Sequence, residues 1–277
     1  SKIEELKHVI KDKKISRVFH CAAFKHVPIV EYNIFSALKN NFVATYDLIN
    51  FLIKIDIDKF TLISTDKAVR PTNIMGASKR LAELSALYLN KMIKHNTKIS
   101  IVRFGNVLES SGSVVPEFRD QILSGGPVTV THPEITRYFM SLEEAALLVI
   151  QTSQLSKGGE IFLLDMGKPI KITDLAKKMI KLSGKSIKNS NKESGDIEII
   201  FSGLRPGEKL FEELLVDRKS KKTSHDFIFQ SVENEIDNKS FEDLLNDLKN
   251  CIDSRDAKKI KILLKNRFIG YINDIDT

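Results

Sequence analysis

The sequence predicts an α/β fold built on a doubly wound parallel sheet. Short apolar segments that suit buried strands alternate with longer segments whose apolar residues recur every three or four positions, as on one face of a helix. Such alternation favours parallel strands joined by right-handed crossovers. The pattern holds up to Phe104. Residues 105–113 then form a loop rich in Gly and Ser, and a smaller second region is expected after it.

The first region is expected to alternate helices and strands regularly. Within its second helix, Phe42, Leu48, Ile49 and Leu52 are expected to face inward. In chain order the predicted elements are a helix 3–10, a strand 16–23, a helix 36–52, a strand 60–64, a helix 77–94 and a strand 100–104.

The second region continues with shorter elements. The sequence Ser-Phe-Glu-Asp at residues 240–243 fits a capping box, so a carboxy-terminal helix is expected to open there. The other predicted elements are helices 116–124, 142–153 and 173–183, and strands 160–165 and 197–201.

Charge and cysteine content argue against several function classes. Lys and Arg number 43 against 36 Asp and Glu, and the basic runs contain no interleaved aromatic residues, so binding to a nucleic-acid duplex is not expected. Two cysteines, Cys21 and Cys251, indicate a reducing compartment, and Cys21 is expected to be a small core residue of its strand. No apolar run approaches the roughly 18 residues of a membrane span.

A polar cluster follows the predicted strand 60–64. Ser64, Thr65, Asp66 and Lys67 come directly after its apolar residues, and Thr72 or Asn73 can cap the next helix, which carries Lys79. In open α/β sheets, ligands bind at the carboxyl ends of the strands. The cluster is therefore a candidate site.

Several motifs carry a resemblance to a known family. They are HCAAFKHVP (20–28), STDKA (64–68), RFGNV (103–107), SGSVVP (111–116), GGPVTVTH (125–132) and LRPGE (204–208). In this order they resemble the polysaccharide-biosynthesis branch of the extended short-chain dehydrogenase/reductase superfamily, the UDP-N-acetylglucosamine 4,6-dehydratases. Where the superfamily has Tyr-x-x-x-Lys, this chain has Met75 before Lys79, which resembles the configuration-retaining subgroup.

The resemblance implies an NAD-dependent lyase, with NADP as an alternative cofactor. Such an enzyme oxidises C4 of the sugar, removes water across C5–C6 and returns the hydride to C6. Asp66 and Lys67 match the acid–base pair, Thr65 the hydroxyl that binds O4, and Lys79 the lysine that holds the nicotinamide ribose. Met75 cannot transfer a proton, and whether Asp66, Thr65 or an ordered water replaces the tyrosine stays open. Cofactor contacts are expected from Ala22, Ala23, Lys25 and Lys79.

The same resemblance implies a UDP-sugar substrate. Its expected contacts are Asn106, Ser113, Val114, Pro116, Thr131, Arg137, Arg205 and Glu208. The two arginines would pair with the pyrophosphate and Glu208 with the ribose. No metal is assigned, because His20 and His26 lack ligand spacing. The alternatives are a UDP-N-acetylhexosamine epimerase of the same family and an inactive fragment that binds only the nucleotide-sugar.

The first glycine of the chain is Gly76, so no glycine-rich turn of a dinucleotide site precedes that position. The expectation is therefore a Rossmann-type fold that lacks its amino-terminal part. The expected ranges are 1–105 for a partial NAD-binding domain, 106–230 for a substrate-binding region and 231–277 for a helical tail. A homo-oligomer is expected, located in the cytoplasm or, with an upstream membrane segment in the parent protein, at the cytoplasmic face of the inner membrane.

Overall fold

The computed structural model describes residues 3–11, 13–92, 94, 96–188, 195–213, 220–233, 237–266 and 269–272. The chain divides into two compact units. Unit 1 comprises Ser1–Phe104, Leu148–Asp165 and Glu213–Thr277, and unit 2 comprises Gly105–Leu147 and Met166–Glu212. Unit 2 is therefore made of two insertions into unit 1.

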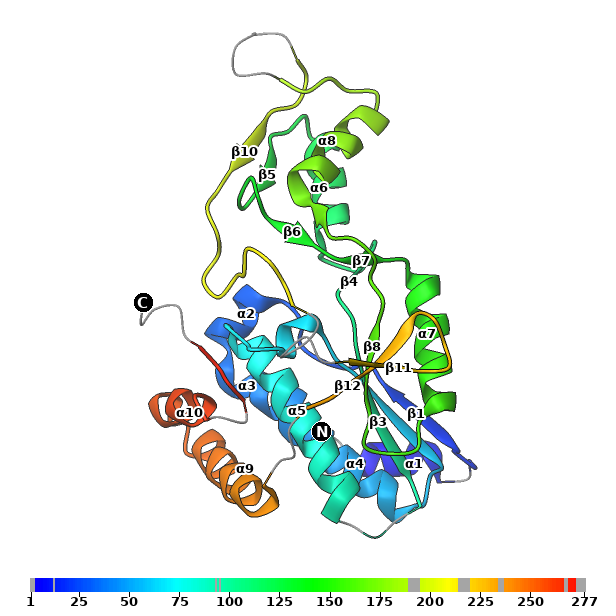
Figure 1. Ribbon diagram of the computed structural model, residues 1–277. Coiled ribbons are helices and arrows are strands. Elements are labelled where there is room, and N and C mark those ends of the chain that lie inside the picture. Colours follow the sequence, from blue (N-terminus) through cyan, green and yellow to red (C-terminus); the bar gives the residue numbers. More distant parts are fainter. Residues whose placement is uncertain are drawn as a thin grey trace. The chain divides into compact units, whose positions relative to one another are not determined.

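Unit 1 is built on a six-stranded sheet with the order β1-β2-β3-β8-β12-β11 among the described strands (Figure 1). The first four strands are parallel, and β12 and β11 add an antiparallel edge. The predicted parallel sheet is confirmed. The bounds are β1 Arg17–His20, β2 Lys59–Ile63, β3 Lys98–Arg103, β8 Ile161–Leu164, β11 Ser220–Lys222 and β12 Ile228–Ser231.

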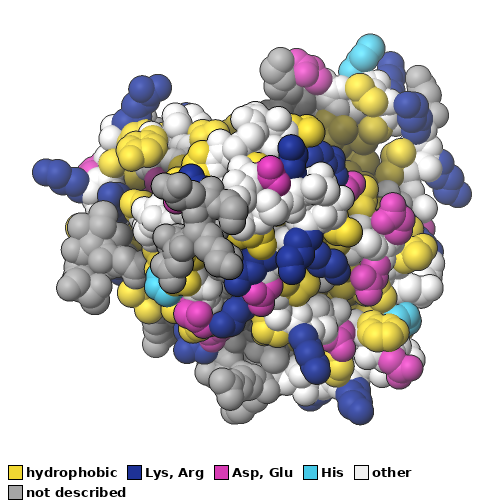
Figure 2. Space-filling model, turned by 90° about the horizontal axis from the view of Figure 1, so that it is seen from above, with side chains coloured by type: hydrophobic (Ala, Val, Ile, Leu, Met, Phe, Trp, Pro, Cys, Tyr) yellow, Lys and Arg dark blue, Asp and Glu magenta, His cyan; other side chains and the backbone are white. Residues whose placement is uncertain are grey.

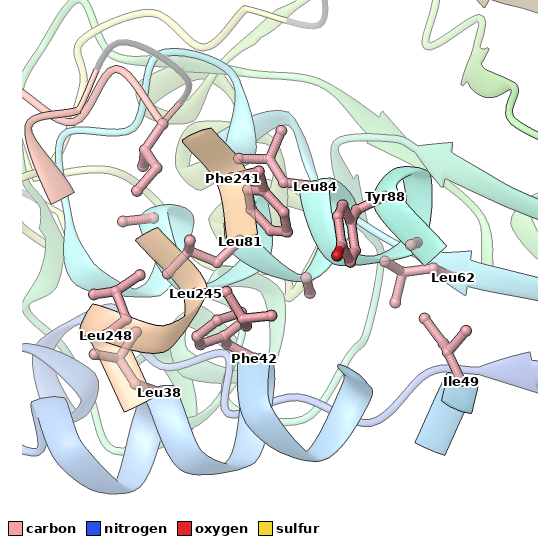
Figure 3. Packing of buried hydrophobic residues seen from close by; sticks show 14 of the residues in the cluster. Leu38, Phe42, Ile49, Leu62, Leu81, Leu84, Tyr88, Phe241, Leu245 and Leu248 are labelled. Atoms are coloured by element: carbon pink, nitrogen blue, oxygen red, sulfur yellow. The ribbon is translucent and has the colours of Figure 1, made fainter. Parts of the chain in front are cut away.

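Helices cover this sheet and supply its core. The predicted helix 36–52 is a continuous helical run of α3 (Ile34–Leu38), a π-helical segment η1 (Lys39–Val43) and α4 (Ala44–Lys54). The predicted helix 77–94 is α5 (Ile74–Met92). Phe42, Leu62 and Leu81 meet in one apolar cluster between these helices and the sheet (Figure 3). Each fully buried side chain of this size stabilises the fold by about 1.5–3 kcal/mol. The shorter helices of unit 1 are α1 (Ile3–Ile10), α2 (Val27–Tyr32) and a 3-10 turn η2 (Asp66–Ala68).

The carboxy-terminal helices do not form a separate tail. Phe241, Leu245 and Leu248 of α9 (Asn238–Asp253) enter the same apolar cluster, and the Phe241 ring lies 5.4 Å from that of Tyr88 on α5. α10 (Ala257–Leu264) buries Ile260 and Leu264 there as well. The expected separation of residues 231–277 is therefore wrong, since the amphipathic faces of these helices complete the core of unit 1.

The capping box expected at residues 240–243 is also wrong. Asp237 caps α9 by accepting a hydrogen bond from the Ser240 backbone amide, so Ser240 lies inside the first turn.

One segment of the expected second region belongs to unit 1 instead. All four residues of β8 are buried, as in a strand with neighbours on both sides and covered faces. The strand pairs with β3 and β12. Residues 148–165, expected within the range 106–230, therefore belong to unit 1. The helix before β8 is α7 (Leu142–Leu155).

Unit 2 has a core of its own. Phe118 and Ile122 of α6 (Val114–Leu123) pack with Val128 of β5 (Val128–Val130) and with Ile180 of α8 (Ile172–Leu182). The remaining described strands form short pairs: β10 (Ile199–Phe201) with β5, β4 (Asn106–Val107) with β7 (Phe139–Met140), and β6 (Thr136–Arg137) with β9 (Ile170–Lys171).

Two surface properties bear on function. No helix among the described residues is long and apolar enough to cross a bilayer. On the face shown in Figure 2, Lys and Arg side chains lie among acidic and apolar ones.

Candidate functional site

The candidate acid–base pair lies directly after β2. The Thr65 hydroxyl donates to Asp66 Oδ1 at 2.8 Å, and Lys67 Nζ donates to the same oxygen at 2.9 Å. Asp66 is fully buried, and its second oxygen, Oδ2, has no hydrogen-bond partner among the described residues. A buried carboxylate oxygen without a donor is costly. It is therefore an unsatisfied acceptor at the candidate site.

The helix α5 begins against this pair. Asn73 caps it by accepting from the Gly76 amide at 2.8 Å, which decides between the two predicted caps. A Cβ at Gly76 would lie 2.2 Å from the Lys67 carbonyl oxygen. The glycine is thus required for the close approach of α5 to the backbone of Lys67.

Lys79 places a buried ammonium at the end of β2. The residue is 5% exposed, and its Nζ donates to the Ile63 carbonyl oxygen at 2.6 Å. Burial lowers the pKa of Lys79 to about 8, and the neighbouring Glu83 carboxylate opposes this shift. Lys79 is therefore a cation at neutral pH that can release its proton at moderate cost.

Met75, at the position of the tyrosine in the superfamily, lies in the apolar core of unit 1 and is 4% exposed. A thioether in such surroundings packs and takes no part in proton transfer.

The segment after β1 carries the expected cofactor contacts. Ala22 and Lys25 are exposed and Ala23 is half-buried. Asn41, on the π-helical segment, holds Phe24 by accepting from its amide at 2.7 Å and donating to its carbonyl at 3.0 Å. Asn41 is not among the residues predicted from the sequence, although an asparagine inside an apolar helical pattern is itself a signal.

His20 lies at the end of β1 and Cys21 at the start of the segment after it. Cys21 is exposed, because β1 ends at His20, so its expected place in the core is wrong. The His20 ring lies 3.0 Å from the Thr45 hydroxyl. Burial, and then the charge of Lys79, lower the pKa of His20 to about 4.

Unit 2 brings together part of the expected substrate set. Glu208 Oε1 accepts from Arg137 Nη2 and from the Thr131 hydroxyl, both at 3.2 Å, and Glu208 Oε2 accepts from the Arg205 amide at 3.0 Å. Arg137 is 7% exposed and also donates to the carbonyl of Thr136 at 2.7 Å. A guanidinium fixed in this way is preorganised for an anion.

The other expected contacts lie around α6 and β4. Ser113 precedes α6 without capping it and has a buried hydroxyl with no partner among the described residues, while Val114 and Pro116 form the first turn. The Arg205 side chain is half-exposed, and its Nη2 lies 3.8 Å from the carboxylate of Glu117, a residue of α6. Asn106 starts β4, where its backbone N–H donates to the Tyr138 carbonyl at 3.0 Å. Within the described part of the chain, no three His, Cys, Asp or Glu side chains are grouped as a metal site.

Comparison with known proteins places the chain in a family. The profile of a family described as "Polysaccharide biosynthesis protein" matches residues 1–233. The chain belongs to this family. It is 56% identical over 209 residues to the capsular polysaccharide biosynthesis protein CapD of Staphylococcus aureus, a match that covers 75% of this chain and 33% of that protein. It is 37% identical to a UDP-glucose 4-epimerase of Rickettsia canadensis, over 73% of this chain and 56% of that protein. The chain thus spans only part of the length of these relatives.

Solved structures agree with the fold. The X-ray structure of Pen from Bacillus thuringiensis matches with a TM-score of 0.71 at 30% identity, covering 88% of this chain and 86% of that chain. A dTDP-glucose 4,6-dehydratase from Streptomyces venezuelae, DesIV, with NAD bound, matches with a TM-score of 0.65 at 16% identity, over 76% of this chain and 67% of that chain. At such low identity the second likeness concerns the fold alone.

Proposed function

We propose that the chain contributes to an NAD-dependent UDP-N-acetylglucosamine 4,6-dehydratase of the configuration-retaining kind, acting in polysaccharide biosynthesis. The observation that carries the proposal is the buried Asp66 carboxylate, which has one oxygen bonded to Thr65 and Lys67 and one without a partner among the residues that the structure describes. Family membership supports the substrate class.

The residues present fit the nicotinamide half of NAD. Lys79 offers an ammonium at the end of β2, and the small side chains of Ala22 and Ala23 leave room after β1. Lys25 follows them on the surface. Bound there, NAD would accept the hydride from C4 of the sugar and supply it later to C6.

Asp66 and Lys67 would perform the proton transfers of the elimination. The base removes the proton from C5, the C6–O6 bond breaks, and the acid protonates O6, so that one water leaves. When the hydride returns to C6, the protonated base would give a proton back to C5. Proton transfer by positioned side chains is typically worth about 10²–10⁴-fold in rate. The 2.9 Å contact between the two groups lets one replenish the proton of the other.

The oxidation step needs a group that accepts the proton of O4, and Met75 does not supply one. Thr65 donates its hydroxyl proton to Asp66 at 2.8 Å. A sugar O4 that donates to Thr65 would therefore pass its proton through the hydroxyl to the carboxylate. Among the alternatives that the sequence leaves open, this relay uses a hydrogen bond already present.

The nucleotide is assigned to unit 2. Arg137 and Arg205 would pair with the pyrophosphate, and Glu208 with a ribose hydroxyl. The Ser113 hydroxyl, which has no partner in the described part of the chain, and the first turn of α6, with Val114 and Pro116, would bind the phosphate side. Thr131 and Asn106 complete the proposed contacts. Self-association stays a prediction.

The competing function is 4-epimerisation of a UDP-sugar, favoured by the Rickettsia relatives named as UDP-glucose 4-epimerases. Both reactions oxidise C4, but only dehydration breaks the C5–H bond. The test incubates the complete gene product that contains this sequence with NAD and UDP-N-acetylglucosamine in D₂O. A dehydratase gives a product that has lost one water and carries deuterium at C5. An epimerase gives an isomer of unchanged mass without deuterium at C5.

A further inference from the structure

A closed network of four charged side chains lies inside unit 1. Glu83 of α5 and Arg103 of β3 have fully buried side chains, and Arg80 and Glu233 flank them with 12% exposure each. Two cations and two anions make the network neutral. None of the proposed catalytic steps uses it.

The contacts in the network fix the Glu83 carboxylate in one orientation. Arg103 Nε donates to Glu83 Oε1 at 2.7 Å, and Arg103 Nη2 donates to Oε2 at 2.6 Å. The third nitrogen of Arg103 donates to Glu233 at 2.5 Å, and Arg80 bridges Glu233 and Glu83 at 2.8 and 3.0 Å. Parallel bonds of this kind define the plane of a carboxylate. Burial alone would raise the pKa of Glu83, but Arg103, Arg80 and the Ser64 hydroxyl together outweigh burial and lower that pKa, so Glu83 stays ionised.

One contact leads from the network to the candidate site. The Ser64 hydroxyl donates to Glu83 Oε1 at 2.6 Å. One helical turn earlier, Lys79 donates to the carbonyl of Ile63 at 2.6 Å. Residues four apart share one helix face, so α5 holds two consecutive residues at the end of β2. Thr65, Asp66 and Lys67 follow directly.

We propose that Glu83 is a positioning residue which, fixed by Arg103 and acting through Ser64, sets where Thr65, Asp66 and Lys67 lie. The proposal rests on the proposed function. A purely stabilising role explains the network poorly, because buried ion pairs can often be replaced by apolar residues without loss of stability. Proton transfer, by contrast, depends on position, since a displacement of about 1 Å can cost roughly 10²-fold in rate.

Ser64→Ala is the informative variant, because it removes the link to β2 and leaves the four charged groups in place. In the complete gene product, we expect kcat to fall by at least about tenfold, while KM for the nucleotide-sugar stays within about twofold. Ser64→Thr keeps the hydroxyl and should restore kcat. The matched control is Ser85→Ala, which removes a buried hydroxyl on α5 that donates to its own helix at Leu81 and is expected to change neither constant.

A second measurement, on residues 1–277, tests the positioning role of Glu83 without using enzyme activity, so that its failure can be told apart from a failure of the proposed function. The Asp66 amide donates to the Phe104 carbonyl at 3.1 Å, so its hydrogen exchange reports how firmly the segment is held. Exchange at Asp66 should accelerate in Ser64→Ala and in Glu83→Gln, but not in Ser85→Ala. If Glu83→Gln does not fold, the exchange rate of Ser64→Ala alone tests the proposal.

Unchanged exchange at Asp66 in Ser64→Ala would overturn the proposal whatever the activity. Accelerated exchange with unchanged kcat would overturn it too, because the segment would then be held without consequence for the reaction. If Asp66→Asn retains full turnover while exchange responds as expected, the acid–base assignment has failed, and Glu83 is left as an anchor of β2 only.

Discussion

Replacing His20 should change how the stability of the chain depends on pH. The His20 ring is largely buried beside Lys79, and its pKa falls from 6.5 to about 4. An unfolded chain therefore binds a proton at His20 at a higher pH than the folded chain does. Between about pH 6.5 and about pH 4, the unfolded state holds more protons, so the free energy of unfolding decreases as the pH is lowered. Above pH 6.5 this group has no further effect.

The size of the effect follows from the two pKa values. Their difference of about 2.5, at 1.36 kcal/mol for each pH unit, corresponds to about 3 kcal/mol across the whole window. In His20→Gln this contribution is absent. Urea unfolding of both proteins, measured between about pH 7 and about pH 4.5, should show the wild-type protein losing about 2–3 kcal/mol relative to the variant. Replacement of the exposed His8 by Gln serves as the control and should leave the wild-type slope unchanged. Equal slopes for wild type and His20→Gln would refute the argument that His20 is held neutral.

Three further changes test the candidate sites. Asp66→Asn keeps an acceptor for Thr65 and Lys67 but loses the carboxylate, so turnover of the complete gene product should fall by about 10²–10⁴-fold while binding of the nucleotide-sugar changes little. A parallel loss of substrate binding would assign Asp66 to positioning. Gly76→Ala should destabilise residues 1–277 by about 1–3 kcal/mol in urea unfolding, because the added Cβ would lie 2.2 Å from the Lys67 carbonyl oxygen. A variant as stable as the wild-type protein would contradict that close approach. Arg137→Ala should weaken UDP binding by about 10–100-fold in calorimetry, because a buried guanidinium is lost. The control Lys171→Ala removes an exposed cation of the same unit and should leave UDP binding unchanged. Equal effects of the two variants would mean that only the net charge of unit 2 matters for UDP binding.

Local patterns in the sequence were sufficient to predict most of the helices and strands and the place of the polar residues of the candidate site after β2. The apolar runs at β2 and β3 and the Asn73 cap of α5 depend on neighbouring residues, and the structure confirms them. The polar residues after β2 could also be predicted, because ligand-binding groups gather at the carboxyl ends of parallel strands.

Long-range pairing lay beyond these patterns. Nothing near β8 indicates that it returns to β3, since short apolar strands suit either unit. The network of Glu83 and Arg103 was missed for a similar reason: a charged residue is expected at the surface unless its partner is known. Arg103 within an apolar strand was the available signal, and its meaning required Glu83, 20 positions earlier in the chain.

The interleaving of the two units affects how the chain is made. The first three strands of unit 1 are complete once Arg103 has left the ribosome, but β8 and α9, which complete its sheet and core, come after parts of unit 2 or all of it. At synthesis rates of 5–20 residues per second, α9 follows β3 by on the order of ten seconds. During that interval the surface of α5 around Tyr88 lacks Phe241 and is exposed to solvent and to other nascent chains. Within this chain, unit 1 thus begins before unit 2 and is completed after it, and its protection against aggregation during translation depends on the late helices α9 and α10.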